Sequence, residues 1–118
     1  MKHSSLEVVR GTLDVLILRA LSWGPQHGYA ISTWIREQTD QELLVEEGAL
    51  YPALYRLESK QWLVSDWGTS DNNRRAKYYT LTPAGRRHLK QEMETWDRYT
   101  KAVSRILSAA AGPGLRRA

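Results

Sequence analysis

The residues best suited to chemistry lie between Gly48 and Arg56, and their types fit contact with a large surface better than catalysis. At about 100° per residue, Leu50, Leu54 and Leu57 share one face of a helix, which indicates a core-facing stripe. The rest of the surface is small or aromatic, whereas a solvated helix usually carries more Glu and Lys. This outer set comprises Gly48, Ala49, Tyr51, Pro52, Tyr55 and Arg56. Small leading residues let a helix approach DNA closely, so that tyrosine and arginine reach phosphates or base edges.

A second candidate cluster is basic. Between Arg74 and Gln91 the chain has six basic residues and no acidic one; they are Arg74, Arg75, Lys77, Arg86, Arg87 and Lys90. The formal net charge is +4 and the sequence pI about 9.6. A concentrated positive field favours a polyanionic partner, and Arg74, Arg75 and Lys77 are placed to follow a DNA backbone or enter a minor groove.

Other chemistry finds little support. The chain has no cysteine, and His3, His27 and His88 are scattered with no carboxylate at ligand spacing. No phosphate-binding glycine loop, nucleophile elbow or catalytic carboxylate pair is present. We therefore expect no enzyme activity, no metal and no cofactor, and interpret His27 as a structural residue at a helix start.

Length and composition indicate one small folded domain. The chain has 118 residues, 42% hydrophobic and 25% charged, values ordinary for a globular protein. No stretch approaches the roughly 18 apolar residues of a membrane span, and the N-terminus lacks a signal-peptide profile. These features predict a cytoplasmic protein with no membrane partner.

The elements that position the two clusters follow from periodicity. Helices are expected from Thr12 to the break at residues 23–25, from His27 to about Gln38, and over 47–60. The first ten residues are expected to extend an amphipathic helix through Leu6, Val8 and Val9. Residues 62–67 and 77–81 predict the strands of a β-hairpin with a polar turn. Three helices and a basic hairpin, in that order, predict a winged helix-turn-helix, mainly α with a small β-hairpin.

Thr82 and Pro83 begin a last helix that is long for so small a domain, about 84–108. Its apolar residues recur at heptad-like spacing; they are Leu89, Met93, Trp96, Val103 and Leu107. Since the domain is too small to cover this stripe, we expect a homodimer interface. The chain then divides into a DNA-binding domain (1–82), a dimerisation helix (83–108) and a flexible tail (109–118).

Three stretches resemble the signature blocks of the PadR family of bacterial transcriptional regulators. They are Gly24–Tyr29, Gly48–Glu58 and Lys77–Gly85, in the right order and spacing, and the similarity covers about residues 8–92. The length resembles the short subgroup, in which one dimerisation helix follows the winged helix. The resemblance implies a homodimeric repressor that binds a pseudo-palindromic operator in double-stranded DNA and is released by a small molecule or stress signal.

The chain departs from the family pattern in two places. Gln61 stands where relatives commonly carry glycine, which predicts a less sharp turn after the central helix. Glu46 and Glu47 stand where Ser-Pro is frequent. Their charge suits a helix start but repels phosphate, so Glu47 either accepts from a cytosine amino group or points away from DNA.

Several residues keep a structural alternative. Tyr51 packs under the hairpin if it does not contact DNA, and Arg56 pairs locally, for instance with Glu58. Trp96 packs in the dimer seam or forms one wall of a pocket for a flat aromatic effector. Among the other tryptophans, the core is expected to hold Trp23, Trp34 and Trp62, and the hairpin to expose Trp67.

Two other functional classes remain open at this stage. The first is a winged-helix module for protein–protein interaction, whose basic face docks an acidic partner. The second is a ligand-carrying protein without DNA function, and the concentrated basic face argues against it.

Overall fold

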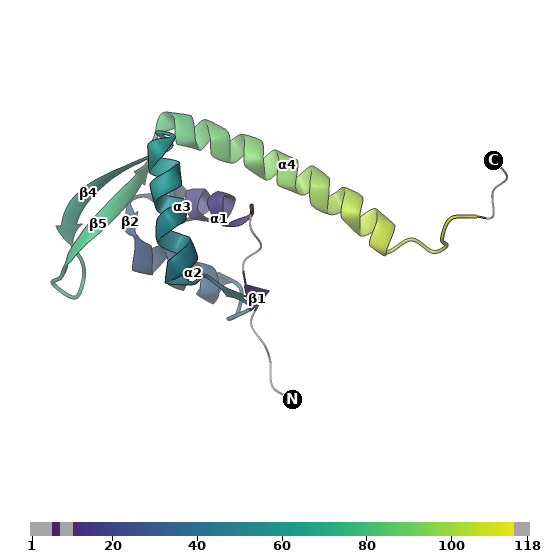
Figure 1. Cartoon of the computed structure of the whole chain (residues 1–118), viewed down its shortest axis with the longest axis horizontal. Coiled ribbons are helices and arrows are strands. Elements are labelled where there is room, and N and C mark those ends of the chain that lie inside the picture. Colours follow the sequence, from purple (N-terminus) through teal and green to yellow (C-terminus); the bar gives the residue numbers. More distant parts are fainter. Residues whose placement is uncertain (1–5, 8–10, 115–118) are drawn as a thin grey trace.

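The computed structural model describes residues 6–7 and 11–114. Three short helices, a hairpin and one long helix follow one another, as Figure 1 shows, and the winged-helix prediction is confirmed. In chain order the elements are β1 (Leu6–Glu7), α1 (Leu13–Ala20), the 3-10 turn η1 (Leu21–Trp23), β2 (Gln26–His27), α2 (Gly28–Gln38), β3 (Leu43–Leu44), α3 (Glu47–Ser59), β4 (Leu63–Thr69), β5 (Arg75–Leu81) and α4 (Pro83–Leu107).

One hydrophobic core holds the three short helices, the base of the hairpin and the start of α4 together. Each helix contributes the residues of a single face, as its periodicity predicts. The core residues are Leu13, Ile17, Leu18, Ala20 and Leu21, then Ile31 and Ile35, then Leu50, Ala53, Leu54 and Leu57, and finally Leu63, Tyr79, Leu81 and Leu89.

The hairpin belongs to an antiparallel sheet with the strand order β2-β5-β4. Its register runs from Leu63 opposite Leu81, in the core, to Thr69 opposite Arg75, near the turn. Because side chains alternate along a strand, the face that starts at Leu63 and Leu81 continues outward to the residues near the turn. The hairpin, here called the wing, therefore extends away from the core, and one of its faces is continuous with the core-facing side of the sheet.

The start of the chain differs from the sequence expectation. Leu6 and Glu7 form a strand instead of a helix, and they pair in parallel with Leu43 and Leu44 of β3. This pairing gives the backbone of the linker before α3 hydrogen-bond partners, which a separate N-terminal helix does not supply. Residues 1–5 and 8–10, including Val8 and Val9, lie outside the described residues.

The turn after α3 is sharp, so the expectation that Gln61 relaxes it is wrong. Gln61 adopts a left-handed conformation with φ of 64°. Its N–H donates to the carbonyl of Glu58 (2.9 Å), and the Trp62 N–H donates to that of Leu57 (3.1 Å). These are the two bonds of a Schellman ending, and here a glutamine takes the position usually held by glycine.

The start of α4 is fixed against that turn. The Thr82 hydroxyl accepts from the Gly85 N–H (2.9 Å) and donates to the carbonyl of Gln61 (2.8 Å). Gly85 is buried, and a Cβ there would collide with the backbone carbonyl of Trp62 and lie 2.9 Å from Leu81 Cδ1. The imidazole of His88 stacks on the Trp62 indole at 3.6 Å between ring centroids. The direction of α4 relative to α3 is therefore set by close contact.

Beyond these contacts α4 leaves the domain, and the molecule measures 67 × 41 × 22 Å (Figure 1). Within the described residues, none of the helices is both long and apolar enough to cross a membrane. Trp23 is 67% exposed and not a core residue, because at the end of η1 its ring packs at the surface, 5.6 Å from the Trp34 ring and 4.3 Å from the guanidinium carbon of Arg19. Trp34 and Trp62 are partly buried against the core, as expected.

The contact at Gly85 generates a stability prediction. Gly85→Ala must displace α4 from Trp62, which lowers the free energy of unfolding by about 2 kcal/mol, since overpacking typically costs about 1–3 kcal/mol. Urea denaturation at a fixed protein concentration measures the loss. Gly112→Ala is the matched control, because nothing lies within 4 Å of a Cβ at that position. Equal stability of the two variants contradicts the contact.

Candidate nucleic-acid interface

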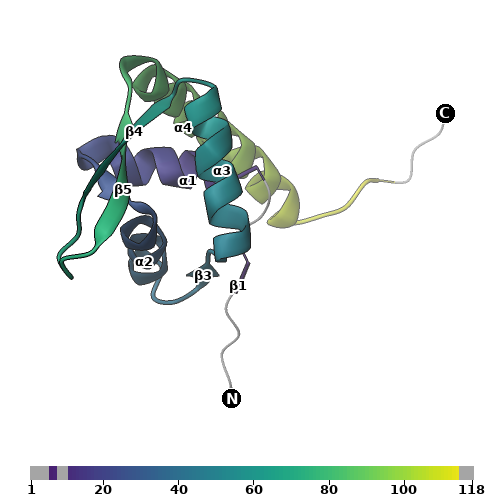
Figure 2. The ribbon, with the colours of Figure 1, turned by 60° about the vertical axis from the view of Figure 1, so that its left-hand side comes forward.

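The outward face of α3 carries the residues that the sequence singled out. Burial of Leu50, Leu54 and Leu57, each at most 1% exposed, turns the opposite side of the helix to solvent (Figure 2). All six candidates are exposed; they are Gly48, Ala49, Tyr51, Pro52, Tyr55 and Arg56. Tyr55 is 73% exposed, and nothing lies within 4 Å of a Cβ on Gly48. The helix thus presents a surface that is small at its start and aromatic further along.

Pro52 lies inside α3, beyond the first turn where a proline is easily accommodated. It lacks the N–H that would otherwise bond to the carbonyl of Gly48, one turn earlier. That carbonyl therefore lacks its i+4 donor, and it belongs to an exposed residue of the outward face.

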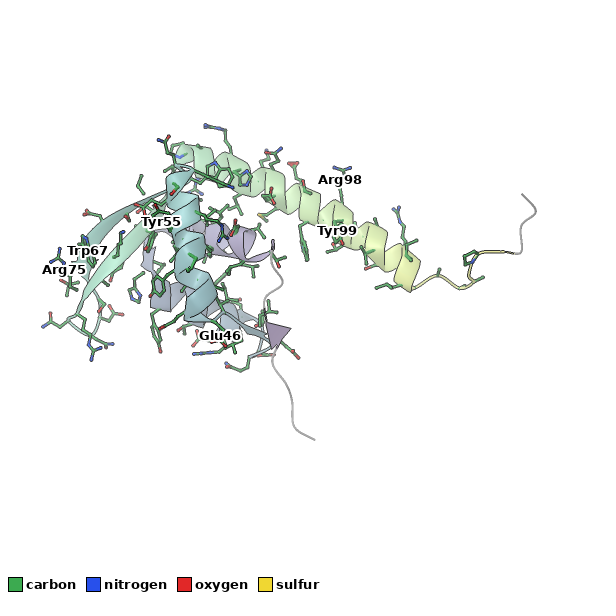
Figure 3. All side chains as sticks on the ribbon, in the orientation of Figure 1. Glu46, Tyr55, Trp67, Arg75, Arg98 and Tyr99 are labelled. Carbon is green, nitrogen blue, oxygen red and sulfur yellow. The ribbon has the colours of Figure 1, made fainter. Side chains whose placement is uncertain are left out.

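The wing's inner face continues the core-facing side of its two strands. Trp67 is paired with Lys77 in the register, and Thr69 with Arg75, so these side chains share the face of Leu63 and Leu81. The Arg75 guanidinium carbon lies 4.7 Å from the Trp67 ring centroid, and Figure 3 shows the two side chains together on the wing. Arg74 follows the turn and is exposed. The wing presents two arginines and an indole.

The candidate cations differ in how they are held. Arg56 Nη2 lies 2.9 Å from Asp14 Oδ1, so its local partner is on α1 and not Glu58. Glu58 accepts from the Ser65 hydroxyl (2.6 Å) and lies 3.9 Å from Lys77 Nζ. Within residues 6–7 and 11–114, no carboxylate forms a salt bridge with Arg74 or Arg75. These two arginines keep their charge unpaired by a carboxylate in this part of the chain.

A hollow separates the wing from α2 and borders α3. Both clusters reach it, Tyr51 from α3 and Arg74, Arg75 and Lys77 from the wing. Sequence reasoning missed the contribution of α2, which includes Tyr29, Thr33, Trp34 and Glu37. The signal for Tyr29 was its position two residues before the buried Ile31, about 200° around the helix from it; Tyr29 is 68% exposed.

The start of α2 is built by close packing around His27 and Gly28. Nδ1 of His27 accepts from the Ala30 N–H (3.2 Å), which confirms the structural role expected for this residue. A Cβ on Gly28 would lie 2.8 Å from the Tyr51 hydroxyl, so the Tyr51 ring rests on the helix start and is still 46% exposed. Burial raises the pKa of the neighbouring Tyr79 above 10.0, and Glu58 and Tyr51 raise it further.

Acidic residues border this surface at the start of α3. Glu46 occupies the N-cap position without a capping hydrogen bond from its side chain, and Glu47 is in the first turn. Both are exposed, and Figure 3 labels Glu46 at this end of the helix. The negative charge favours the helix dipole and opposes phosphate close to the helix start.

The apolar stripe of α4 divides into two parts. Leu89 is 4% exposed and belongs to the core of its own protomer, which leaves it almost no surface for a partner helix. Further along, Met93, Trp96 and Leu107 are 42%, 48% and 80% exposed, and Val103 is partly buried. The uncovered stripe therefore begins at Met93. The Trp96 and Tyr99 rings lie 6.3 Å apart on it.

No group of three or more metal-binding side chains occurs among the residues that the structure describes. What remains is an outward helix, an arginine-bearing wing and an uncovered helix stripe. Together they define a protein of the winged-helix class, in which one helix and a hairpin contact a double-stranded nucleic acid.

Comparison with known proteins identifies the family. A model described as "Transcriptional regulator PadR-like family" matches residues 17–91. The chain is 30% identical over 109 residues to Transcriptional regulator Rv3488 of Mycobacterium tuberculosis, with 92% of this chain and 97% of that protein covered. The chain therefore belongs to the PadR-like family of transcriptional regulators. Transcriptional regulation is a non-enzymatic role.

Comparison with solved structures leads to the same family. A transcriptional regulator from Clostridium thermocellum is 36% identical with a TM-score of 0.74, over 81% of this chain and 93% of that one. A PadR family regulator from Clostridium difficile is 34% identical with a TM-score of 0.72, over 83% of this chain and 100% of that one. The family resemblance found in the sequence is confirmed.

Proposed function

We propose that this protein is a homodimeric, cytoplasmic repressor that binds a pseudo-palindromic operator in double-stranded DNA and leaves it in response to a small molecule or stress signal. The observation that carries the proposal is that the outward helix and the arginines of the wing border one hollow. A major groove admits one helix, and the neighbouring backbone then passes toward the wing. Residues 1–82 would form the DNA-binding domain, here called the reading domain.

The outward face of α3 supports insertion into the groove. Gly48, Ala49 and Pro52 provide the small surface that close approach requires. Tyr51 and Tyr55 place hydroxyl groups at the border of this surface, where they can donate hydrogen bonds to phosphate oxygens. Arg56 reaches DNA only if its guanidinium binds phosphate while it remains near Asp14 or exchanges one partner for the other.

Glu47 is exposed at the leading end of this helix. In the proposed complex it points away from the bases, because acidic contacts to base edges are much rarer than phosphate contacts by basic groups. The alternative is acceptance from a cytosine amino group, which would give the operator a preferred C·G pair at that position.

The uncovered stripe of α4 supports the second copy. Residues 83–108 would form the dimerisation helix, with Met93, Trp96, Val103 and Leu107 in the interface. Leu89 is excluded from this set by its burial in its own protomer. A two-fold dimer carries two reading domains, which matches two half-sites of opposite direction. Residues 109–118 would remain a tail.

Trp96 also supports an effector site at the dimer seam. Its indole is 48% exposed, with the Tyr99 ring beside it. Across a two-fold axis, one indole from each protomer would form the opposite walls of a slot for a flat aromatic compound. Such a compound would change the separation of the reading domains through α4.

Gly48→Ala tests the close approach of α3. The added methyl group meets open space in the free protein, and alanine favours a helix, so the fold is kept or slightly stabilised. Against DNA the same methyl group clashes, and we expect about tenfold weaker operator binding, from an overpacking cost of about 1–3 kcal/mol. Fluorescence anisotropy with operator DNA measures the affinity. Unchanged affinity means that the start of α3 is not held against DNA.

Arg74→Gln with Arg75→Gln tests the wing. The double variant should no longer shift operator DNA from the region upstream of its own gene, while its dimer stays intact by light scattering. Arg98→Gln with Arg105→Gln removes the same charge from exposed positions of α4 and should keep the shift. Unchanged binding of the wing variant sinks the proposed role of the wing. Weak, sequence-blind binding by the wild type instead favours a module that docks an acidic protein.

Val103→Glu tests the dimer seam. A carboxylate in an apolar interface has no partner there, so we expect the dissociation constant of the dimer to rise at least tenfold. Ala102→Glu introduces the same charge at the preceding residue, which is exposed and faces away from the stripe. Analytical ultracentrifugation compares the two variants. Equal association of both contradicts the assignment of the stripe as the interface.

A further inference from the structure

Trp67 lies on the wing where no core packing explains it. It is 56% exposed, and it extends from the strand face that is buried at Leu63 and only half-buried at Ser65. Its backbone N–H is bonded to its own neighbour, the Asp66 carboxylate (2.9 Å), and its side chain lies outside the core cluster. An exposed indole at this place requires a reason other than stability of the fold.

The indole contacts the Arg75 side chain. The guanidinium carbon of Arg75 lies 4.7 Å from the ring centroid of Trp67, within the range of a cation–π contact. The two residues come from different strands and are diagonal neighbours in the register, because Thr69 pairs with Arg75 and Trp67 with Lys77. Figure 3 shows both side chains on the same part of the wing.

Two other interface cations, Arg56 and Lys77, have carboxylate partners, and Lys77 Nζ lies in addition 6.0 Å from the Tyr79 ring centroid. Asp14 binds a guanidinium nitrogen of Arg56, and Glu58 lies near the ammonium of Lys77. Carboxylates such as these occupy donors and cancel charge. An indole face does neither, since it touches the plane of the guanidinium and leaves the edge with its five N–H donors open. The Arg75 side chain donates no hydrogen bond to another of the residues that the structure describes.

We propose that Trp67 is a positioning residue that holds the Arg75 guanidinium ready for a DNA phosphate or minor-groove base edge. The inference rests on the proposed DNA-binding function and adds to it the reason why one wing arginine is ordered before binding. A free arginine side chain loses rotamer freedom when it binds, and prior stacking removes part of that loss. Trp67 acts through Arg75 and needs no contact with DNA of its own.

The size of the effect follows from the strength of an exposed cation–π contact. Loss of the indole should weaken operator binding about two- to fivefold for each wing, which is the equivalent of about 0.5–1 kcal/mol. With two wings in a dimer the combined loss is about four- to 25-fold.

A double-mutant cycle tests the inference. Operator affinity is measured over a range of salt concentrations for the wild type, Trp67→Ala, Arg75→Ala and the variant with both changes. If Trp67 acts through Arg75, the double variant binds like Arg75→Ala alone. Each phosphate contact contributes about 0.9 to the slope of log affinity against log salt. Arg75→Ala should lower this slope, and Trp67→Ala should lower it in the same direction.

Two further variants separate positioning from simple loss of structure. Val64→Ala is the matched control, since Val64 is an apolar residue of the same strand, 54% exposed, on the opposite face. It should leave both affinity and salt slope unchanged. Trp67→Phe keeps an aromatic face and should recover most of the affinity lost in Trp67→Ala. Circular dichroism melting checks that the variants remain folded.

The outcomes are distinct. If the loss of affinity in the double variant equals the product of the losses in the two single variants, Trp67 contacts DNA independently of Arg75. This result overturns the positioning role. A Trp67→Ala variant with wild-type affinity and slope, beside a weakened Arg75→Ala, overturns the inference and leaves the proposed function intact. An unaffected Arg75→Ala shows instead that the proposed function of the wing has failed.

Discussion

Burial of three leucines on α3 is the constraint on which the other features depend. With Leu50, Leu54 and Leu57 almost completely excluded from solvent, the rotation of the helix about its axis is fixed. A shift of one residue in the core would turn the helix by about 100°. Gly48, Pro52 and Tyr55 would then no longer face outward together. The wing and α4 follow the same constraint, since the sharp ending of α3 at Gln61 directs the chain into both.

Much of this architecture was visible in the sequence, and the failures have physical causes. Helical periodicity located α1, α2, α3 and α4, and turn-forming residues located the wing, because these signals are local. The strand at Leu6–Glu7 depends on its partner Leu43–Leu44, and the ion pair of Arg56 depends on Asp14, 42 residues away. No local pattern reports such contacts. Leu89 fitted the heptad spacing of the seam, but spacing cannot tell a partner helix from the protomer's own core.

The cations of the proposed interface are restrained in three different ways. A carboxylate on α1 binds Arg56, a carboxylate on α3 itself lies near Lys77, and an indole supports Arg75. Each restraint links an interface side chain to a different part of the fold. Arg75 is thus linked to the opposite strand of the hairpin, Lys77 to α3, and Arg56 to α1, which packs against α4.

The two carboxylates at the start of α3 have a kinetic consequence. Binding to DNA of arbitrary sequence rests almost wholly on attraction to phosphates. In the proposed complex, Glu46 and Glu47 would reduce that attraction at the start of α3, whatever bases are present. The dwell time of that complex on unrelated DNA would then be shorter. A regulator of this kind finds a rare site among many wrong ones by leaving the wrong ones quickly.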